Sequence, residues 1–156
     1  MLQLSNFWDF IERFKETCKA KGWKILEQGD IIYEGGKYHQ MILLHQIHFE
    51  TFRRVTLNPH RFIREGETLN MINISYIAWI SREAIPSEAL NFIFAEPRLL
   101  SRVALYDLSP LREGRKLCLK INETDSAVFR EFENFLEKNG LSSLPLTKKE
   151  NINFSH

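Results

Sequence analysis

Apolar residues recur every three or four positions near both ends of the chain, which is the spacing of an amphipathic helix. Near the N-terminus, Ser5 is a candidate N-cap and Gly22 a candidate C-terminal stop, so we predict a helix over Asn6–Lys21. Its apolar stripe consists of Phe7, Phe10, Ile11, Phe14 and Cys18. A second helix is predicted between Thr124 and Asn139-Gly140, with the stripe Val128, Phe129, Phe132, Phe135 and Leu136.

Between these helices the apolar residues alternate or form short runs bounded by glycine and proline, which is typical of β-strands. The segment Met71–Ile80 carries bulky apolar residues on both faces, and therefore predicts a central strand that is covered on both sides. Other strands are predicted at Trp23–Glu27, Ile31–Tyr33, Val103–Leu108 and Lys116–Asn122. In the last strand we expect Leu117, Leu119 and Ile121 to face inward, and Lys116, Cys118 and Lys120 to face outward.

The stretch Tyr38–Leu57 fits two structures. We favour a strand through about Phe49, a bend, and a second strand that ends before Asn58-Pro59. The helical alternative has the apolar line Leu44, Ile47, Thr51 and Val55. Farther along, Pro86 and Ser87 predict the start of a helix, and Pro97 interrupts or restarts it.

The order of elements is therefore α, several β, α, ββ, α. Since short turns join most of the strands, we expect an α+β fold with a mostly antiparallel sheet of about five to seven strands, flanked by N-terminal, middle and C-terminal helices. Residues 1–140 are expected to form a single domain, and the polar residues 141–156 a loosely attached tail. The element order over Asn6–Gly140 resembles that of the small chaperones of type III secretion and their bacterial relatives.

Composition narrows the class of protein. The chain has 156 residues and a net charge of +1, so it has no overall field that would attract nucleic acid or anionic lipid. Its N-terminus lacks the pattern of a signal peptide and no apolar run is long enough to span a membrane, so we expect a cytoplasmic protein without membrane contact. Twelve phenylalanines are the compositional exception, and a binding surface can use those that the core does not.

Charge is unevenly distributed in two places. The segment 52–64 has four arginines and no acid, and arginine matches phosphate and carboxylate groups while phenylalanine stacks on bases. The candidate residues for binding an anion or an acidic partner are Phe52, Arg53, Arg54, Arg61, Phe62 and Arg64. The alternative is a charged edge strand that prevents aggregation, in which Arg53 and Arg54 face opposite sides. The polar side of the C-terminal helix is expected to face solvent and carries Asp125, Glu131, Glu133 and Glu137.

Histidine and cysteine are the remaining candidates for chemistry. His39 and His45 share a face if their segment is a strand, and His45 and His48 share a face if it is a helix. No third ligand is evident nearby, so we expect structural histidines, with no metal and no cofactor. Cys118 lies between two lysines that would favour its thiolate, but the sequence supplies no base for it, and we expect either a small apolar filler or an inert surface thiol.

The sequence contains no phosphate-binding loop, dinucleotide fingerprint, zinc-protease helix or nucleophile elbow. We therefore expect a non-enzymatic protein-binding accessory module, such as a chaperone, adaptor, inhibitor or immunity-type protein. Its partner would be another protein or a second copy of the chain. The alternative is a nucleic-acid-binding accessory protein that uses segment 52–64, and the second alternative is an enzyme without a readable motif, centred on His39, His45 or Cys118.

Overall fold

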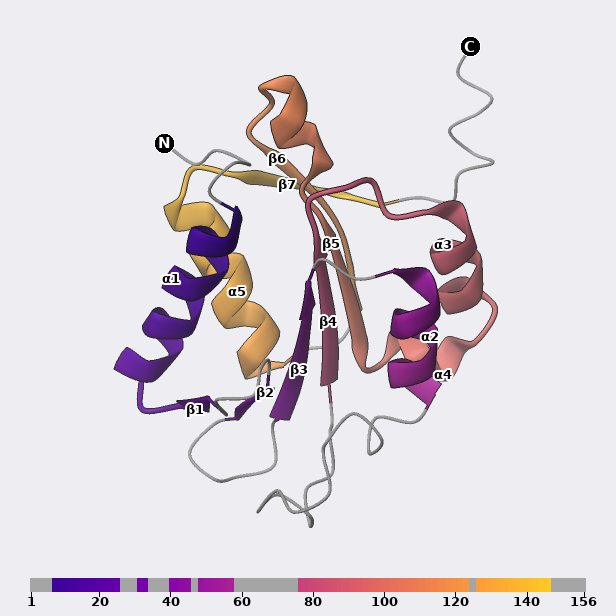
Figure 1. Ribbon diagram of the computed structural model, residues 1–156, viewed down its shortest axis with the longest axis horizontal. Coiled ribbons are helices and arrows are strands. Elements are labelled where there is room, and N and C mark those ends of the chain that lie inside the picture. The colour runs from indigo at the N-terminus through magenta and orange to yellow at the C-terminus, as the bar shows by residue number, and fades with distance from the viewer. Residues whose placement is uncertain are drawn as a thin grey trace.

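The computed structural model of the protein describes residues 7–25, 31–33, 40–45, 48–57, 76–123 and 126–146. A mixed β-sheet lies between two layers of helices (Figure 1). Helices α1 (Phe7–Ala20) and α5 (Ala127–Lys138) cover one face of the sheet. The other face is covered by α2 (Phe49–Leu57), α3 (Ser87–Phe94) and α4 (Pro97–Leu100). The predicted α+β class is therefore confirmed.

The strands of the described residues follow one another across the sheet in chain order. They are β1 (Lys24–Ile25), β2 (Ile31–Tyr33), β3 (Gln40–His45), β4 (Tyr76–Ser81), β5 (Val103–Asp107), β6 (Leu117–Asn122) and β7 (Ser142–Pro145). The pairs β3–β4, β4–β5 and β6–β7 are parallel, and the pairs β1–β2, β2–β3 and β5–β6 are antiparallel.

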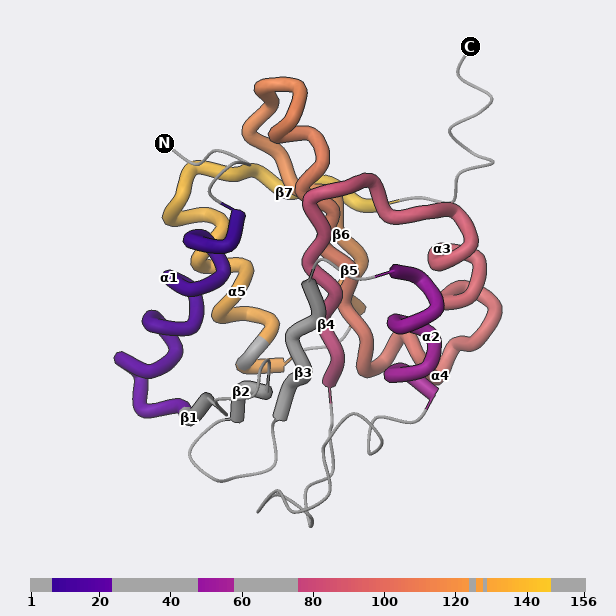
Figure 2. Tube along the Cα trace, in the orientation of Figure 1, coloured from indigo at the N-terminus to yellow at the C-terminus, as the bar shows by residue number. Residues whose placement is uncertain are grey.

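The prediction of five to seven mostly antiparallel strands is wrong for the body of the sheet. Its centre consists of the four longer strands, β3 to β6, and two of their three pairings are parallel. The reason is that helices, and not short turns, connect β3 to β4 and β4 to β5. Each helix returns the chain to the edge where the preceding strand began, so the next strand runs in the same direction. Between β5 and β6 the chain turns through the 3₁₀ helix η3 (Ser109–Glu113), which extends beyond the sheet (Figure 2).

Helix α2 replaces the second strand that we favoured for the end of Tyr38–Leu57. Phe52, Val55 and Thr56 are buried at the spacing of one helical face, while Arg53 and Arg54 are exposed. Phe52 packs on Trp79 of β4, with ring centroids 4.6 Å apart. The burial of this face against the sheet explains why the segment is a helix, whereas the sequence pattern alone allowed both structures.

Strand β4 confirms the described part of the predicted central strand Met71–Ile80, whose residues 71–75 lie outside the described part of the chain. Ala78 and Ile80 belong to the core beneath α1 and α5, and Ile77 and Trp79 to the core beneath α2, α3 and α4. Every phenylalanine that the structure describes is buried or half-buried. The large number of phenylalanines is therefore explained by the two cores.

Two expectations at the C-terminal end are wrong. Cys118 does not face outward, because β6 is covered on both sides and the thiol lies in the core beneath α1 and α5. Residues 142–145 form β7 rather than the start of a loose tail, and Leu141 and Leu146 on either side of it are buried. Residues 147–156 lie outside the described part of the chain. Within that part, no helix has the length and apolar character needed to cross a membrane.

Candidate ligand-binding site

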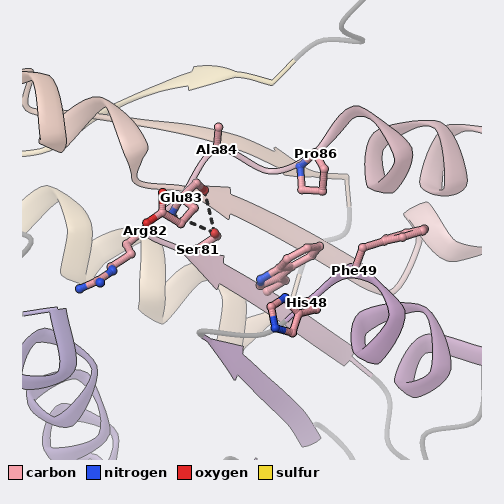
Figure 3. A pocket seen from close by; sticks show the side chains of 8 residues that line it. His48, Phe49, Ser81, Arg82, Glu83, Ala84 and Pro86 are labelled. Carbon is pink, nitrogen blue, oxygen red and sulfur yellow. Dashed lines mark hydrogen bonds between the residues drawn. The ribbon is translucent and has the colours of Figure 1, made fainter.

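A pocket of about 330 Å³ lies at the carboxyl end of β4, between the first residues of α2 and those of α3 (Figure 3). We call it the Trp79 pocket. Its lining residues are His48, Phe49, Trp79, Ser81, Arg82, Glu83, Ala84 and Pro86. A volume of this size suffices for a small organic molecule.

The position of the pocket follows from the parallel strands. In the register of β3 and β4, His45 pairs with Ile80, so both strands end at the same edge of the sheet. Each then leads into a helix on the same face, and the two helices begin side by side, α2 after His48 and α3 after Pro86. Loops that leave the ends of strands often carry binding residues, so this edge is a candidate position for a site.

The wall of the pocket is held in place by hydrogen bonds to two side chains. The Ser81 hydroxyl donates to the carbonyl oxygen of Glu83 at 2.7 Å and accepts from its backbone N–H at 3.1 Å. Asp107, which is only 3% exposed, accepts from the Ile85 N–H at 3.1 Å and from the Ser109 N–H at 2.8 Å. These bonds fix the loop before α3 and the start of η3 relative to β5, so the wall is preorganised.

Trp79 supplies a hydrogen-bond donor that no described residue uses. Its side chain is 2% exposed and lines the pocket, and its Nε1–H has no hydrogen-bond partner among the described residues. A buried donor without a partner costs about 1–3 kcal/mol, and few such groups occur in native proteins. An acceptor atom of a ligand in the pocket, or an ordered water molecule, would remove this cost.

The predicted arginine segment is not part of this pocket. Arg53 and Arg54 are exposed on α2 and neither of them lines the pocket, and Arg53 forms an ion pair with Glu50 at 2.6 Å. Phe52 is fully buried, so it cannot stack on a base. The remaining predicted residues, Arg61, Phe62 and Arg64, lie outside the described residues.

The structure places the histidines on different elements. The backbone of His45 belongs to β3, His48 directly precedes α2, and His39 lies outside the described residues. His45 and His48 therefore do not share a helix face. His48 is exposed and lines the Trp79 pocket. Within the described ranges, no three His, Cys, Asp or Glu side chains are grouped so that they could hold a metal ion.

Both cysteines are buried and far from a reactive state. Burial raises the pKa of the Cys118 thiol to about 12, with a further contribution from the charge of Asp107 and a partial offset from Lys120. Burial and the charge of Glu131 likewise raise the pKa of Cys18 to about 12. The thiolate is the nucleophile, so neither cysteine is poised for nucleophilic catalysis.

Two acidic residues of α5 do not face solvent as we expected. Glu131 is 7% exposed and forms an ion pair with Lys21 at 3.2 Å. Glu133 points at the sheet, where its carboxylate accepts from the Tyr106 hydroxyl at 3.0 Å and from the Lys120 ammonium at 2.5 Å. The Asn122 side-chain amide donates to the same carboxylate. We call Glu133, Tyr106, Lys120 and Asn122 the Glu133 cluster.

The pKa values in the Glu133 cluster follow from its contacts. Burial alone would raise the pKa of Glu133, but the hydrogen bonds from Lys120, Asn122 and Tyr106 and the charge of Lys120 outweigh it and lower the pKa. Burial raises the pKa of Tyr106 well above its usual value, and the charge of Glu133 adds to the shift. The cluster therefore holds an ionised carboxylate and a neutral phenol, which suits a fixed structural contact between α5 and the sheet.

The sequence analysis missed the Trp79 pocket. The available signal was the run of polar residues and Pro86 between the predicted central strand and the next helix, since loops that leave parallel strands carry binding residues. That signal requires knowing that the strands are parallel, and the sequence had suggested the opposite. The sequence analysis therefore assigned no role to Ser81, Arg82 and Glu83.

Comparisons with protein-family models, with curated proteins and with solved structures match nothing. The resemblance in element order to the type III secretion chaperones therefore gains no support from them. The geometry of the described residues alone supports the proposals below.

Proposed function

We propose that the protein is a small-molecule-binding domain whose ligand occupies the Trp79 pocket. The observation that carries this proposal is that Trp79, whose buried Nε1–H has no partner among the described residues, lines a pocket at the carboxyl edge of parallel strands. The pocket combines aromatic walls with a few polar groups, which is the usual composition of a ligand site. Its loop is fixed by Ser81 and Asp107, so the site exists before the ligand arrives.

No chemical step is part of this proposal. The Ser81 hydroxyl donates to and accepts from the backbone of Glu83, so both hydrogen bonds serve the structure of the loop. The two cysteines are buried with raised pKa values. The residues of the pocket are therefore suited to holding a ligand, and the proposal is one of binding.

A library of small organic compounds tests the proposal by ligand-detected NMR. His48→Trp places a larger ring at the pocket mouth, and Leu57→Trp makes the same addition at the exposed far end of α2. We expect compounds that bind the natural protein at about 1 mM or below and bind His48→Trp about tenfold more weakly. Leu57→Trp should bind them normally. A library without a single binder that depends on position 48 would contradict the proposal.

Protein binding is a second candidate function, and one observation favours it. On α2, Leu57 is 60% exposed and shares the helix with the exposed Arg53 and Arg54, a combination that suits an acidic protein segment. Strand β7 is less suitable for adding a partner strand, because Pro145 has no N–H to donate. The phenylalanines of the described residues are used in the core.

Charge reversal on α2 tests the second candidate. We expect a partner retained from a lysate of the native host to be lost from the double variant Arg53→Glu/Arg54→Glu and kept by Arg98→Glu, an exposed arginine on α4. Retention that is equal in both variants contradicts this role for α2. A gel shift at low salt with the same pair of variants distinguishes a protein partner from nucleic acid.

A further inference from the structure

The first residues of two helices meet at the Trp79 pocket. His48 and Phe49, at the start of α2, and Pro86, at the start of α3, are among its lining residues (Figure 3). These helices have nine and eight residues, so each presents a full first turn of backbone N–H groups. Aligned peptide dipoles give a helix N-terminus a partial positive charge, and two of them at one site favour an anion.

Helix α3 begins without a side-chain cap. Its N-cap residue is Pro86, which has an extended backbone and no side-chain acceptor for the first N–H groups. The Pro86 carbonyl accepts from the N–H groups of Ala89 at 3.0 Å and Leu90 at 3.3 Å, which belong to the next part of the turn. An anionic group in the pocket would take the place of the missing cap.

Trp79 is an independent observation that points to the same kind of ligand. Its Nε1–H is a donor only, is buried, and lacks a partner among the residues that the structure describes. The residue Trp79 lines the same pocket as the two helix starts. Helix starts and indole alike offer hydrogen-bond donors, so the group that completes the site is an acceptor.

The charges around the pocket are compatible with an anion. Among the lining residues the acid is Glu83, and its carboxylate forms an ion pair with Arg112 of η3. Glu50 in the first turn of α2 is paired with Arg53, and Glu88 in the first turn of α3 is exposed and does not line the pocket. Arg82 lines the pocket but extends away from His48 and Pro86 in Figure 3. Its charge therefore adds to the field without filling the centre.

From these observations we infer that the ligand carries a carboxylate or phosphate group, bound between the starts of α2 and α3, and a flat apolar body that contacts Phe49 and Trp79. This inference rests on the proposed binding function and names its ligand class. Arg112 acts as a specificity-determining residue, because it neutralises the Glu83 carboxylate that would otherwise repel the anion.

Four probes of similar size test the charge of the ligand by calorimetry. Benzoate and phenyl phosphate are anionic, benzamide has the shape of benzoate without its charge, and benzylammonium is a cation. We expect benzoate or phenyl phosphate to bind at least about tenfold more tightly than benzamide, and benzylammonium more weakly still. Comparison of the two anions decides between a carboxylate and a phosphate. Anion affinity should decrease as salt is added.

Matched variants assign the effect to the pocket. Trp79→Phe removes the donor and should weaken the better anion about tenfold, relative to its effect on benzamide. Arg112→Gln should weaken that anion severalfold and leave benzamide unchanged, and adding Glu83→Gln should restore the affinity. Arg98→Gln removes an exposed arginine that is also paired with an acid, Glu96, and should change nothing.

Four outcomes would overturn the inference. They are equal affinity for benzoate and benzamide, a preference for benzylammonium, no binding of any of the four probes, and equal losses in Arg112→Gln and Arg98→Gln. The proposed function fails separately, when no compound of the larger library binds in a manner that depends on position 48. If the library yields neutral or cationic compounds whose binding depends on position 48, the proposed binding function stands and the inference of an anionic ligand fails.

Discussion

The two faces of the sheet differ in whether their buried polar groups have hydrogen-bond partners among the described residues. Beneath α1 and α5, the hydroxyl of Tyr106 donates to Glu133, which also accepts from Lys120 and Asn122. Beneath α2 and α3, the Nε1–H of Trp79 has no partner within the described chain. Tyr106 and Trp79 lie on the neighbouring strands β5 and β4, and both are almost completely buried.

The difference indicates what each face does. On the first face, helix α5 brings a carboxylate to the sheet, and aromatic rings fill the space around it, with Phe132 in edge contact with Tyr106 at a centroid distance of 4.7 Å. On the second face, no described group accepts a hydrogen bond from the indole Nε1–H, and Trp79 lines a pocket. We interpret the first face as the stabilising one and the second as the binding one. The predictions below test that division, from the largest expected effect to the smallest.

The two thiols should be strongly protected, because both belong to the core beneath α1 and α5. We expect Cys18 and Cys118 to react with iodoacetamide at pH 8 at least about a thousandfold more slowly in the native protein than in denaturant, since only opened molecules expose them. Mass spectrometry of the alkylated protein measures both rates. Rapid labelling of either native thiol contradicts a closed core on this face.

Removal of an aromatic ring from this core should be costly. Phe132 is 1% exposed and packs on Phe10, Phe14 and Tyr106, so Phe132→Ala should lower the free energy of unfolding by about 3–5 kcal/mol. Urea denaturation measures the change, and Leu57→Ala at an exposed position should stay within about 0.5 kcal/mol of the natural protein. A loss below about 1 kcal/mol for Phe132→Ala would show that α5 is not firmly packed.

Removal of the acceptor in the Glu133 cluster should cost less. Glu133→Ala leaves the buried Tyr106 hydroxyl without its partner, and we expect a loss of about 1–3 kcal/mol. Because the two groups interact, the double variant Glu133→Ala/Tyr106→Phe should lose less than the sum of the single changes. Glu137→Ala, an exposed glutamate of the same helix, is the control. Additive losses would show that the hydroxyl and the carboxylate do not depend on each other.

The Glu133 cluster should make the stability of the folded protein modestly dependent on pH. The pKa of Glu133 is lower in the folded protein than its ordinary value of 4.5, so its ionised form stabilises the fold above that value. This contribution should disappear as the pH decreases from 4.5 through the lower folded pKa. Thermal unfolding should accordingly show that Glu133→Gln is less stable than the natural protein at pH 7. On acidification the variant should lose less stability than the natural protein. Parallel curves for the two proteins contradict the direction of the shift.

Periodicity predicted the elements whose surroundings are uniform. The helix stripe from Phe7 to Cys18 and the stripe from Phe129 to Leu136 are each buried along one side, so a single apolar line on the sequence sufficed. The prediction for segment 49–57 was wrong because the sequence pattern fits two structures. Phe52 and Val55 fit one face of a helix, but the segment also fits a strand. Only the sheet beneath it decides between the two structures.

The features that depend on distant segments were not predictable. Parallel pairing of β3 with β4 depends on a helical connection that was predicted as a strand. Glu133 lies on the polar side of its helix, as expected, yet it contacts Lys120 and Asn122. Sequence periodicity alone does not predict this contact between a helix and a strand. The Trp79 pocket is formed by the ends of α2, β4 and α3 together, so no single stretch of sequence contains its signal.

The indole N–H of Trp79 itself reports most directly on whether the second face binds a ligand. In a ¹H–¹⁵N spectrum the three tryptophans, Trp8, Trp23 and Trp79, give three indole signals, and the one that disappears in Trp79→Phe belongs to Trp79. On titration with benzoate or phenyl phosphate, whichever binds more tightly, we predict that the Trp79 indole proton moves downfield as it gains an acceptor, while those of Trp8 and Trp23 stay in place. A Trp79 signal that remains fixed while the probe saturates the protein would contradict the account.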